Sequence, residues 1–483
     1  MYLGLDLGTS SLKGLLVDEQ QQIVAQASSG LTVSRPQDGW SEQDPADWVA
    51  ACETVLDALK ASHPAQLAAV RGIGLSGHMH GATLVDRADQ VIRPCILWND
   101  TRSHREAQEL DGDAQFRQIT GNIVFPGFTA PKLVWVAKHE PEVFGKIAKV
   151  LLPKDYLRLW LTGGHVAEMS DAAGTSWLDT GKRDWSDELL EATGLSRGQM
   201  PSLVEGSAVS GTLRDALAEA WGLPKGVVVA GGGGDNAAAG IGLGVVKAGQ
   251  AFVSLGTSGV LFAANDGYQP DPETAVHTFC HALPDTWHQM GVILAATDCL
   301  NWLARVLGAS PAELTEGLGP LTAPGRALFL PYLGGERTPL NDAAIRASFM
   351  GLEHATSRED MVRAVLDGVT FALRDCRDAL AATGTRIDRM LATGGGARSD
   401  TWLAAIATAL NTPVDVPAAG DFGAALGAAR LGFMAAEDAG AEVAAPPPVA
   451  RSIDPEPKLL DAFDDAHARW QEARDGLVAL ALD

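Results

Sequence analysis

Two short stretches of the chain share a Leu-Gly-Thr-Ser core whose residue types suit phosphate binding. The first is DLGTSSLKG, residues 6–14, and the second is VSLGTSGVLF, residues 253–262, which lacks the aspartate. A Gly-Thr-Ser turn exposes successive backbone N–H groups beside hydroxyl donors, and such a concavity fits phosphate oxygens. One copy alone is equally consistent with an ordinary tight turn. The repetition predicts two turns that hold a polyphosphate from both sides.

Asp6 directly precedes the first turn and is a candidate metal ligand. Mg²⁺ keeps several of its waters in proteins and needs only one or two carboxylates beside the substrate phosphates. We therefore expect Asp6 to hold a magnesium ion, directly or through water, next to the phosphates that the turn binds.

Asp235 ends the glycine run of GGGGDNAAAG, residues 231–240. An aspartate before a run of alanines is well placed to cap a helix. Glycines also let a substrate approach the backbone closely, and a hydroxyl that attacks a phosphate needs a proton acceptor within hydrogen-bond reach. A helix N-terminus keeps a carboxylate ionised, so Asp235 can cap the helix and act as the general base at once.

A polar and aromatic cluster surrounds two short predicted strands between residues 72 and 102. His78, Met79 and His80 lie at a turn between strands, and Trp98 and Asn99 begin the segment WNDTR. A single histidine in such a turn is more often structural, but an aromatic face beside amide, carboxylate and guanidinium groups suits a polyhydroxylated sugar. A metal site built on the two histidines is less favoured, because no cysteine or third histidine lies nearby in the sequence.

The segment TGGGARSD, residues 393–400, follows a predicted strand and opens a helix. Its glycines leave room for a flat ring to lie against the backbone, although the segment alone is equally a helix-entry turn. Other nucleotide motifs are missing: the chain has no GxxxxGK[ST] loop and no HRD catalytic loop. The match to GxGxxG at residues 72–77 precedes a polar turn and a strand, where a dinucleotide fold requires a helix.

The composition is typical of a soluble globular protein, and the net charge disfavours polyanion partners. The chain has 483 residues, 46% of them hydrophobic, and a formal net charge of -23, so nucleic-acid binding is not expected. No signal segment and no apolar run of membrane-spanning length is visible, so we expect no membrane association. Five scattered cysteines without a CxxC pair fit a reducing compartment, which predicts a cytoplasmic protein.

The order of the predicted elements indicates an α/β protein of two similarly built domains. The first segment is predicted as strand, turn and strand, followed by a helix over residues 45–62. The second LGTS core begins the same pattern again half a chain later, which places a boundary near residue 247. We expect an N-terminal domain over 1–246, a C-terminal domain over 247–440, and a linker with a terminal helix over 441–483.

These motifs together resemble the FGGY family of carbohydrate kinases over nearly the whole chain. GFTAPKLVWVAKHE, residues 127–140, and GLEHATSREDMVRAVLDG, residues 351–368, resemble the two signatures of the family. The resemblance implies two actin-like or Hsp70-like ATPase domains of ribonuclease H-like topology with a cleft between them. The first domain would carry the sugar site and the base, and the second would bind the nucleotide.

Within the family, the chain resembles the members that phosphorylate the ketopentose D-xylulose. The resemblance lies in SGHMHGATL, ILWNDTR, LPKDYLRL, MSDAAGT, SLGTSG and GERTP. A glycerol-specific member would show an Arg-Glu pair in place of Met79 and His80, and three glycines rather than four would be expected before Asp235. The resemblance implies ATP, Mg²⁺ and the formation of D-xylulose 5-phosphate; a homodimer is compatible with it.

The resemblance also assigns a role to each candidate residue. It implies that Asp235 is the catalytic base, that Asp6 serves the metal, and that Met79 and His80 contact the sugar with Trp98 and Asn99 nearby. The ATP-binding residues would be Gly8, Thr9, Ser10, Lys13 and Thr257 at the phosphates and Gly395, Gly396 and Ala397 under the adenosine.

Three other functions compete with this one. A kinase for another ketose, such as ribulose, would share every motif. A catalytically silent sugar sensor is disfavoured by the intact aspartates and glycine loops. A chaperone-like ATPase is disfavoured because no peptide-binding β-domain follows the second half.

Overall fold

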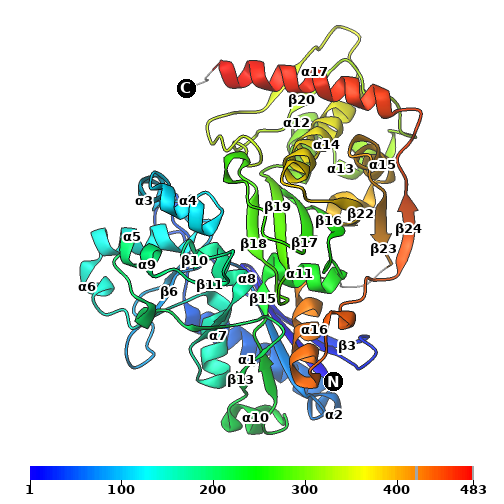
Figure 1. Cartoon of the computed structure of the whole chain (residues 1–483). Helices are drawn as coiled ribbons and strands as arrows, with labels where there is room; N and C mark the ends of the chain where they lie inside the picture. The colour runs from blue at the N-terminus through cyan, green and yellow to red at the C-terminus, as the bar shows by residue number, and fades with distance from the viewer. Residues whose placement is uncertain (419–422, 481–483) are drawn as a thin grey trace.

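The chain forms two α/β lobes, each built on a mixed sheet (Figure 1). The computed structural model describes residues 1–418 and 423–480, and over these residues both sheets have seven strands. The first sheet has the order β13-β14-β5-β1-β2-β3 with β15 beside β5, and the second has the order β18-β19-β17-β16-β22-β23-β24.

The first sheet begins at the N-terminus and is covered by a helix with clear local start signals. Helix α1 (Pro45–Ser62) starts where Asp44 accepts a hydrogen bond from the Ala46 N–H at 2.9 Å, with a proline at its first position. This confirms the helix predicted over 45–62. The strands are β1 (Tyr2–Leu7), β2 (Ser11–Val17), β3 (Ile23–Gly30), β5 (Gly72–Gly77), β13 (Val209–Thr212), β14 (Val228–Ala230) and β15 (Gly233–Gly234).

The second sheet carries the C-terminal half of the chain, including its last helix. Its strands are β16 (Gly249–Leu255), β17 (Gly259–Asn265), β18 (His277–Cys280), β19 (Trp287–Ile293), β22 (Ile387–Thr393), β23 (Val414–Pro417) and β24 (Val449–Ile453). The segment that begins at residue 441, predicted as a linker before the terminal helix, therefore contains a strand, β24. The associated helices are α12 (Thr297–Leu307), α13 (Pro311–Glu316), α14 (Arg358–Ala382), α15 (Asp400–Ala409) and α17 (Leu460–Ala479), with a small β20 (Leu328–Leu330) and β21 (Ser348–Met350) pair.

The two sheets repeat one topology. Strand β1 pairs antiparallel with β2 and parallel with β5, and β16 pairs antiparallel with β17 and parallel with β22. The next strand outward is parallel in both sheets, and an antiparallel edge strand closes that side of each. This repetition agrees with the two related α/β domains expected from the sequence.

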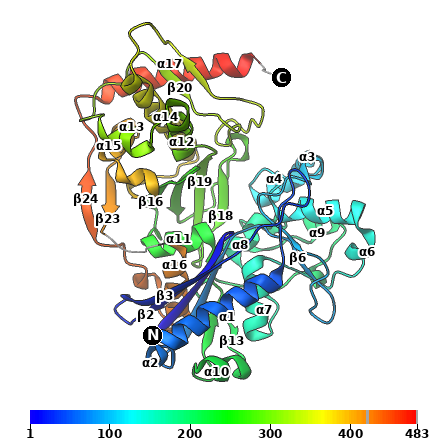
Figure 2. The ribbon, with the colours of Figure 1, turned by 180° about the vertical axis from the view of Figure 1, so that it is seen from behind.

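A long insertion between β5 and β14 builds one side of the first lobe. Most of it is coloured cyan to green and lies on the left in Figure 1 and on the right in Figure 2. Its elements are β6 (Thr83–Val85), β7 (Cys95–Ile96), α3 (His104–Asp111), α4 (Ala114–Thr120), α5 (Thr129–His139), α6 (Pro141–Phe144), β8 (Lys149–Leu151), α7 (Pro153–Thr162), β9 (Val166–Glu168), α8 (Met169–Ala172), β10 (Leu178–Asp179), β11 (Asp184–Trp185), α9 (Asp187–Ala192), β12 (Ser202–Val204) and α10 (Asp215–Trp221). Two short elements precede β5 and its insertion, β4 (Glu42–Gln43) and α2 (Pro64–Leu67).

Two helices pack against each other at the waist of the molecule, between the two lobes (Figures 1 and 2). Helix α11 (Asp235–Leu243) follows the first sheet, and its Gly240 lies against Phe262 of the second sheet. Helix α16 (Ala424–Glu437) follows the second sheet but packs on β1 and β5 of the first. A Cβ added to Gly74 would lie 1.7 Å from the Ala428 carbonyl oxygen, so these strands need glycine. The GxGxxG match at 72–77 is therefore strand β5 itself, and its glycines admit a helix.

Candidate active site

Asp235 is the first residue of α11 and lies where the two lobes meet. Its Oδ1 accepts hydrogen bonds from the Asn236 backbone N–H at 2.7 Å and side-chain Nδ2 at 2.9 Å. Burial and the negative charge of Asp6 raise the pKa of Asp235 to about 6, against the opposing effect of the Asn236 hydrogen bonds. A carboxylate with such a pKa is ionised at neutral pH and close to the ideal strength for a general base.

The glycine run before Asp235 is explained by close backbone contacts. Gly232 has a φ of +80°, and a Cβ there would lie 2.2 Å from the Leu75 carbonyl oxygen. A Cβ on Gly234 would lie 2.9 Å from Met79 Cγ, so this glycine lets a predicted sugar-binding residue approach the base. The fourth glycine, which was not expected, therefore fits a turn whose backbone lies against Leu75 on one side and Met79 on the other.

A buried ion-pair network lies beneath this turn and was not predicted as part of the site. Lys154 Nζ, fully buried on α7, lies 2.8 Å from Asp155, 2.9 Å from Asp171 and 3.2 Å from Glu168. Burial and the neighbouring carboxylates raise the pKa of Asp171 well above its ordinary value, against the lowering effect of Lys154. Removing one member of such a network leaves an uncompensated buried charge and is strongly destabilising.

Arg158 connects this network to the glycine turn that precedes Asp235. Its guanidinium donates to the backbone carbonyls of Ala230 at 2.7 Å and Gly231 at 2.5 Å, directly before the turn that leads to Asp235. On the other side, the Gly234 N–H donates to Ser170 Oγ at 3.1 Å. The stretches LPKDYLRL and MSDAAGT contain these side chains. Sequence reasoning assigned no role to Arg158 or Ser170, because their partners are backbone atoms of a distant segment.

The first hairpin places Asp6 next to Lys13. The two residues are register partners across β1 and β2, and Ser76 is the partner of Asp6 on the other side, in β5. Burial raises the pKa of Asp6, which the Ser76 hydroxyl and the Lys13 charge oppose. Burial lowers the pKa of Lys13, which Asp6 opposes. Because Asp6 also raises the pKa of Asp235, the two carboxylates lie within range of each other's charge.

The turn of this hairpin is held by contacts to its backbone. The Gly8 N–H donates to the Ser11 carbonyl at 3.0 Å, and the Leu31 N–H donates to the Ser10 carbonyl at 2.8 Å. Trp98, with 47% of its surface exposed, donates from Nε1 to Thr9 Oγ1 at 3.0 Å. Trp98, predicted to lie near the sugar, therefore lies against the phosphate turn.

His80 is held in one orientation by several elements of the insertion. Its φ is +69°, and its carbonyl accepts hydrogen bonds from Lys132 Nζ at 2.8 Å and Thr129 Oγ1 at 3.2 Å. The ring stacks on Phe128 at 4.6 Å, and Nδ1 lies 2.7 Å from the Gly174 carbonyl. Burial and the Lys132 charge lower the pKa of His80 to about 3, so the ring is neutral. Since a carbonyl only accepts, Nδ1 carries the proton and Nε2 is left as an acceptor.

These contacts give the first family-like signature, residues 127–140, a physical role: its Thr129 and Lys132 fix the backbone of His80. Sequence reasoning named neither residue.

His78 has different surroundings, since its ring meets Trp48 of α1 edge to face at 5.8 Å. Among the described residues, no group of three metal-ligating side chains is present. Asn99 is partly buried and follows Trp98, in a loop that the buried Asp100 fixes by accepting from the Ser41 N–H at 2.6 Å.

In the second lobe, a cavity of about 970 Å³ lies at the start of α12 and α15. Gly395 and Gly396 line it together with Thr297 and Asn301, whereas Ala397 is buried beside it. A Cβ added to Gly395 would meet no atom within 4 Å, so this glycine presents bare backbone to the cavity. A cavity of this size fits a nucleoside.

The second LGTS turn adjoins this cavity through α12. The Thr297 N–H and Oγ1 donate to the Gly256 carbonyl at 2.9 and 2.7 Å, and the Ala296 N–H donates to the Thr257 carbonyl at 2.8 Å. Thr297 itself lines the cavity. Thr257 is exposed and thus accessible to a ligand that extends from the cavity.

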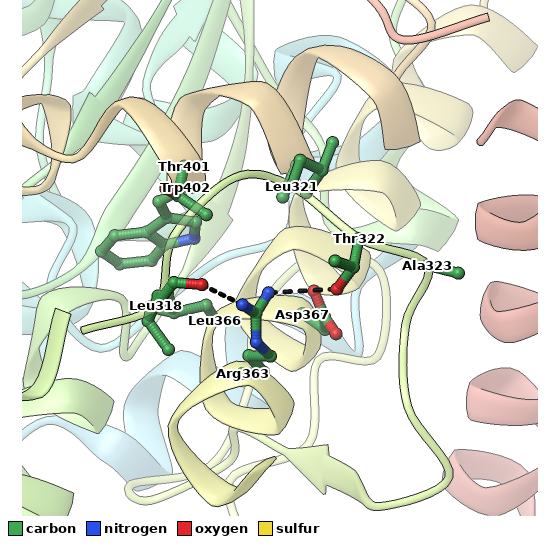
Figure 3. Close-up of a pocket in the computed structure, with 10 residues that line it drawn as sticks. Leu318, Leu321, Thr322, Ala323, Arg363, Leu366, Asp367, Thr401 and Trp402 are labelled. Atoms are coloured by element: carbon green, nitrogen blue, oxygen red, sulfur yellow. Dashed lines mark hydrogen bonds between the residues drawn. The ribbon is translucent and has the colours of Figure 1, made fainter. Parts of the chain in front are cut away.

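A much smaller cavity lies behind Trp402, which lines both spaces (Figure 3). Arg363 of α14 donates to Thr322 Oγ1 at 3.1 Å and to the Leu318 carbonyl, and so ties the loop before β20 to the helix. The cavity has a volume of about 20 Å³, enough for a water molecule but not for an organic ligand. The second signature, residues 351–368, therefore supports the wall of the larger cavity from behind.

Two related α/β lobes, each with a Gly-Thr-Ser turn, and a buried carboxylate at their junction are the features of a phosphotransferase of the actin-like ATPase fold. The comparisons with known proteins identify the family. The profile of the FGGY family of carbohydrate kinases, N-terminal domain, matches residues 1–242, and that of its C-terminal domain matches residues 251–436. The chain belongs to the FGGY family of carbohydrate kinases, and ATP is its co-substrate.

Named relatives cover almost the whole chain. It is 50% identical over 439 residues to the xylulose kinase of Escherichia coli K12, covering 90% of each protein. The crystal structure of a "xyloylose kinase" from Brucella ovis superposes with a TM-score of 0.98 at 62% identity and 99% coverage of both chains. The crystal structure of the xylulose kinase from Rhodospirillum rubrum superposes with a TM-score of 0.93 at 29% identity and 99% coverage of both chains.

Proposed function

We propose that this chain transfers the γ-phosphoryl group of ATP to the terminal hydroxyl of D-xylulose, which gives D-xylulose 5-phosphate and ADP. One observation carries the proposal: Asp235, whose pKa is raised to about 6, directly follows Gly234, and a Cβ on Gly234 would lie 2.9 Å from Met79, the neighbour of His80. The choice of sugar is supported by relatives named xylulose kinase, of which the first is 50% identical.

In this reaction Asp235 accepts the proton of the sugar hydroxyl as the oxygen attacks the γ-phosphorus and the bond to ADP breaks. Such transfers pass through a loose transition state, so positioning and charge neutralisation do most of the work. His80 is neutral with its Nδ1 proton engaged, which leaves Nε2 to accept a hydrogen bond from a sugar hydroxyl. Met79, buried between Gly174 and Gly234, would pack against the carbon chain of the sugar.

The nucleotide would lie across both lobes. The cavity with Gly395 and Gly396 would take the adenosine, with Ala397 buried beneath, and Thr257 would reach the phosphates from the second lobe. From the first lobe, the phosphates would be met by Gly8, Thr9, Ser10 and Lys13. Trp98 would keep the Thr9 side of the turn in place.

The residues present fit a magnesium ion that enters with the nucleotide. Asp6 is a partly buried carboxylate at the turn, and the described residues contain no cluster of three ligating side chains. Magnesium commonly takes one or two carboxylates and completes its shell with phosphate and water oxygens. When bound, the ion would neutralise phosphate charge as the phosphoryl group moves.

ADP release measured across ketoses, aldoses and glycerol tests the proposal. D-xylulose should give the highest kcat/KM, and preferential turnover of ribulose would identify the other ketose kinase. If none of the sugars in the panel causes ADP release, the chain is a catalytically silent sugar sensor. Addition of EDTA should abolish turnover, and excess Mg²⁺ should restore it.

Assembly and location belong to this proposal as well. A homodimer is tested by light scattering of the purified chain at several concentrations. Within the described residues no helix is long and apolar enough to cross a membrane. All five cysteines are unpaired and buried, which supports the expectation of a cytoplasmic enzyme.

A further inference from the structure

Arg337 belongs to the GERTP stretch, the one family-like motif whose role is not explained by the site above. Its backbone is fixed on both sides. Glu336 Oε1 accepts hydrogen bonds from the Leu294 N–H at 2.9 Å and the Arg337 N–H at 2.8 Å. The Thr338 N–H donates to the Val292 carbonyl at 3.0 Å. These bonds attach the segment to the end of β19 in the second lobe. The backbone of Arg337 is therefore fixed, and its side chain extends from a fixed point.

The Arg337 side chain reaches from the second lobe to the first. Its Cζ lies 4.6 Å from the ring centroid of Phe125, which belongs to the insertion of the first lobe. Its Nη1 lies 3.5 Å from Nε2 of His277, a ring that burial and the Arg337 charge keep neutral. In the described part of the chain, the Arg337 guanidinium contacts His277 and Phe125, the charge of Glu336 acts on it without an ion pair, and part of the residue's surface is accessible.

This guanidinium shares an aromatic wall with the residues expected to hold the sugar. The Phe125 ring lies 5.5 Å from the Phe128 ring, and Phe128 stacks on His80. The positive charge of Arg337 also lowers the pKa of His80, so the two groups lie within electrostatic range. On the side of Asp235, the preceding residue Gly234 lies against Met79, the neighbour of His80 in the chain. Asp235 and Arg337 are thus both connected to the surroundings of His80, one through Met79 and one through the aromatic wall.

We propose that Arg337 recognises the end of the ketose remote from the phosphorylated carbon, by donating hydrogen bonds to the O1 hydroxyl of the sugar. The inference rests on the proposed function and adds a specificity-determining contact from the second lobe. A guanidinium has five N–H donors in a planar fork, and this one has surplus donors. Because its backbone belongs to one lobe and its ring contact to the other, the same contact would favour sugar binding between the lobes.

Steady-state kinetics of Arg337→Gln with two sugars test the proposal. D-xylulose carries O1, and 1-deoxy-D-xylulose lacks it. A hydrogen bond from a charged group is worth about 10- to 100-fold, so the wild type should prefer D-xylulose by that factor in kcat/KM. Arg337→Gln should lose the preference by slowing turnover of D-xylulose while hardly changing that of the deoxy sugar. KM for ATP should stay unchanged.

Three controls keep the outcomes distinct. Arg386→Gln removes an arginine of the same lobe that is 72% exposed and paired with Asp388, and it should behave as the wild type. Arg337→Lys keeps the charge without the fork and should retain part of the preference. Thermal melting of each variant shows whether a loss reflects unfolding.

Equal slowing of both sugars in folded Arg337→Gln, or no slowing of either, would overturn the Arg337 proposal while leaving the xylulose kinase activity standing. If the wild type prefers another sugar, the proposed substrate is wrong. The same comparison is then made with that sugar and its analogue lacking the remote hydroxyl, where loss of discrimination still supports Arg337. If the wild type phosphorylates no sugar, both proposals fall.

Discussion

The two LGTS hairpins have the same core sequence but different geometry and charge. In the first, Leu7 pairs with Leu12, so four residues form the turn, and Asp6 faces Lys13. In the second, Leu255 pairs with Gly259, so three residues form the turn. The position before Leu255 is Ser254, and it faces Val260. Both copies of the repeated sheet therefore contain the turn, but only the first turn is flanked by charged groups, Asp6 and Lys13.

The segments behind the hairpins differ in the same sense. The helix after the first sheet begins with Asp235, whereas the glycine turn of the second sheet presents bare backbone at Gly395. Proton transfer and charge neutralisation need ionisable groups, whereas a flat nucleoside needs space and amide contacts. From this comparison we expect the first lobe to supply the proton acceptor and the metal ligand, and the second lobe to bind the nucleoside. The predictions below test this division, from the largest expected effect to the smallest.

The largest effect is expected from Asp235→Asn. The amide cannot accept the sugar proton, so kcat should fall by about 10²- to 10⁴-fold, the usual contribution of a general base. Nucleotide binding by the second lobe should persist, because no second-lobe residue changes. Sugar-dependent ADP release and calorimetric titration with ATP measure the two properties. Wild-type turnover in this variant would remove Asp235 from the role, and loss of ATP binding would contradict the division of labour.

Gly74→Ala should destabilise the fold without touching either turn. The added methyl would lie 1.7 Å from the Ala428 carbonyl oxygen of α16, which crosses from the second lobe onto the first sheet. Overpacking of this kind typically lowers the free energy of unfolding by about 1–3 kcal/mol. Denaturant unfolding measures the change. Gly395→Ala is the matched control, because its methyl meets no protein atom and should leave stability unchanged while weakening ATP binding. If Gly74→Ala is as stable as Gly395→Ala, α16 can shift to accommodate the methyl group at little cost in free energy.

Much of this architecture follows from local sequence patterns. The helix predicted over 45–62 is found with these bounds because its start signal is local, a capping aspartate before a proline. Helix α14 likewise begins at a local signal, the Ser357–Asp360 capping box. The two hairpins likewise follow from alternating strands around glycine turns. The FGGY family and the repeated α/β fold could be inferred from the same motifs.

The remaining features depend on contacts between distant segments. The packing of α16 on the sheet of the first lobe cannot be predicted from the sequence, because glycines in a strand indicate close approach without identifying the partner. Arg158 acts on carbonyls more than 70 positions away, and Lys132 holds a carbonyl 52 positions away. Trp98 was placed with the sugar from its residue type, but its hydrogen bond goes to Thr9. The catalytic and binding roles themselves stay predictions.

The pH dependence of kcat/KM tests whether the two carboxylates of the first lobe are coupled. Protonated Asp235 cannot accept the sugar proton, so kcat/KM should fall about tenfold per pH unit below pH about 6, the pKa of this group. Asp6 raises that pKa, so Asp6→Asn should move the acid limb of its residual activity to lower pH. The matched change in the second hairpin, Ser254→Ala, should leave the limb in place. An unmoved limb in Asp6→Asn would show that another group titrates there.

Trp98→Phe should have the smallest effect and would sharpen the comparison of the two turns. The first turn is fixed partly by the 3.0 Å hydrogen bond from Trp98 to Thr9, whereas the second is fixed by backbone bonds from the start of α12. A neutral hydrogen bond contributes about 0.5–1.5 kcal/mol, so KM for ATP should rise by no more than about tenfold. KM for the sugar should hardly change, since the bond goes to the phosphate turn. Initial rates at varied ATP and varied sugar separate the two constants. A larger rise in the KM for the sugar would return Trp98 to the sugar site, where its residue type had first placed it.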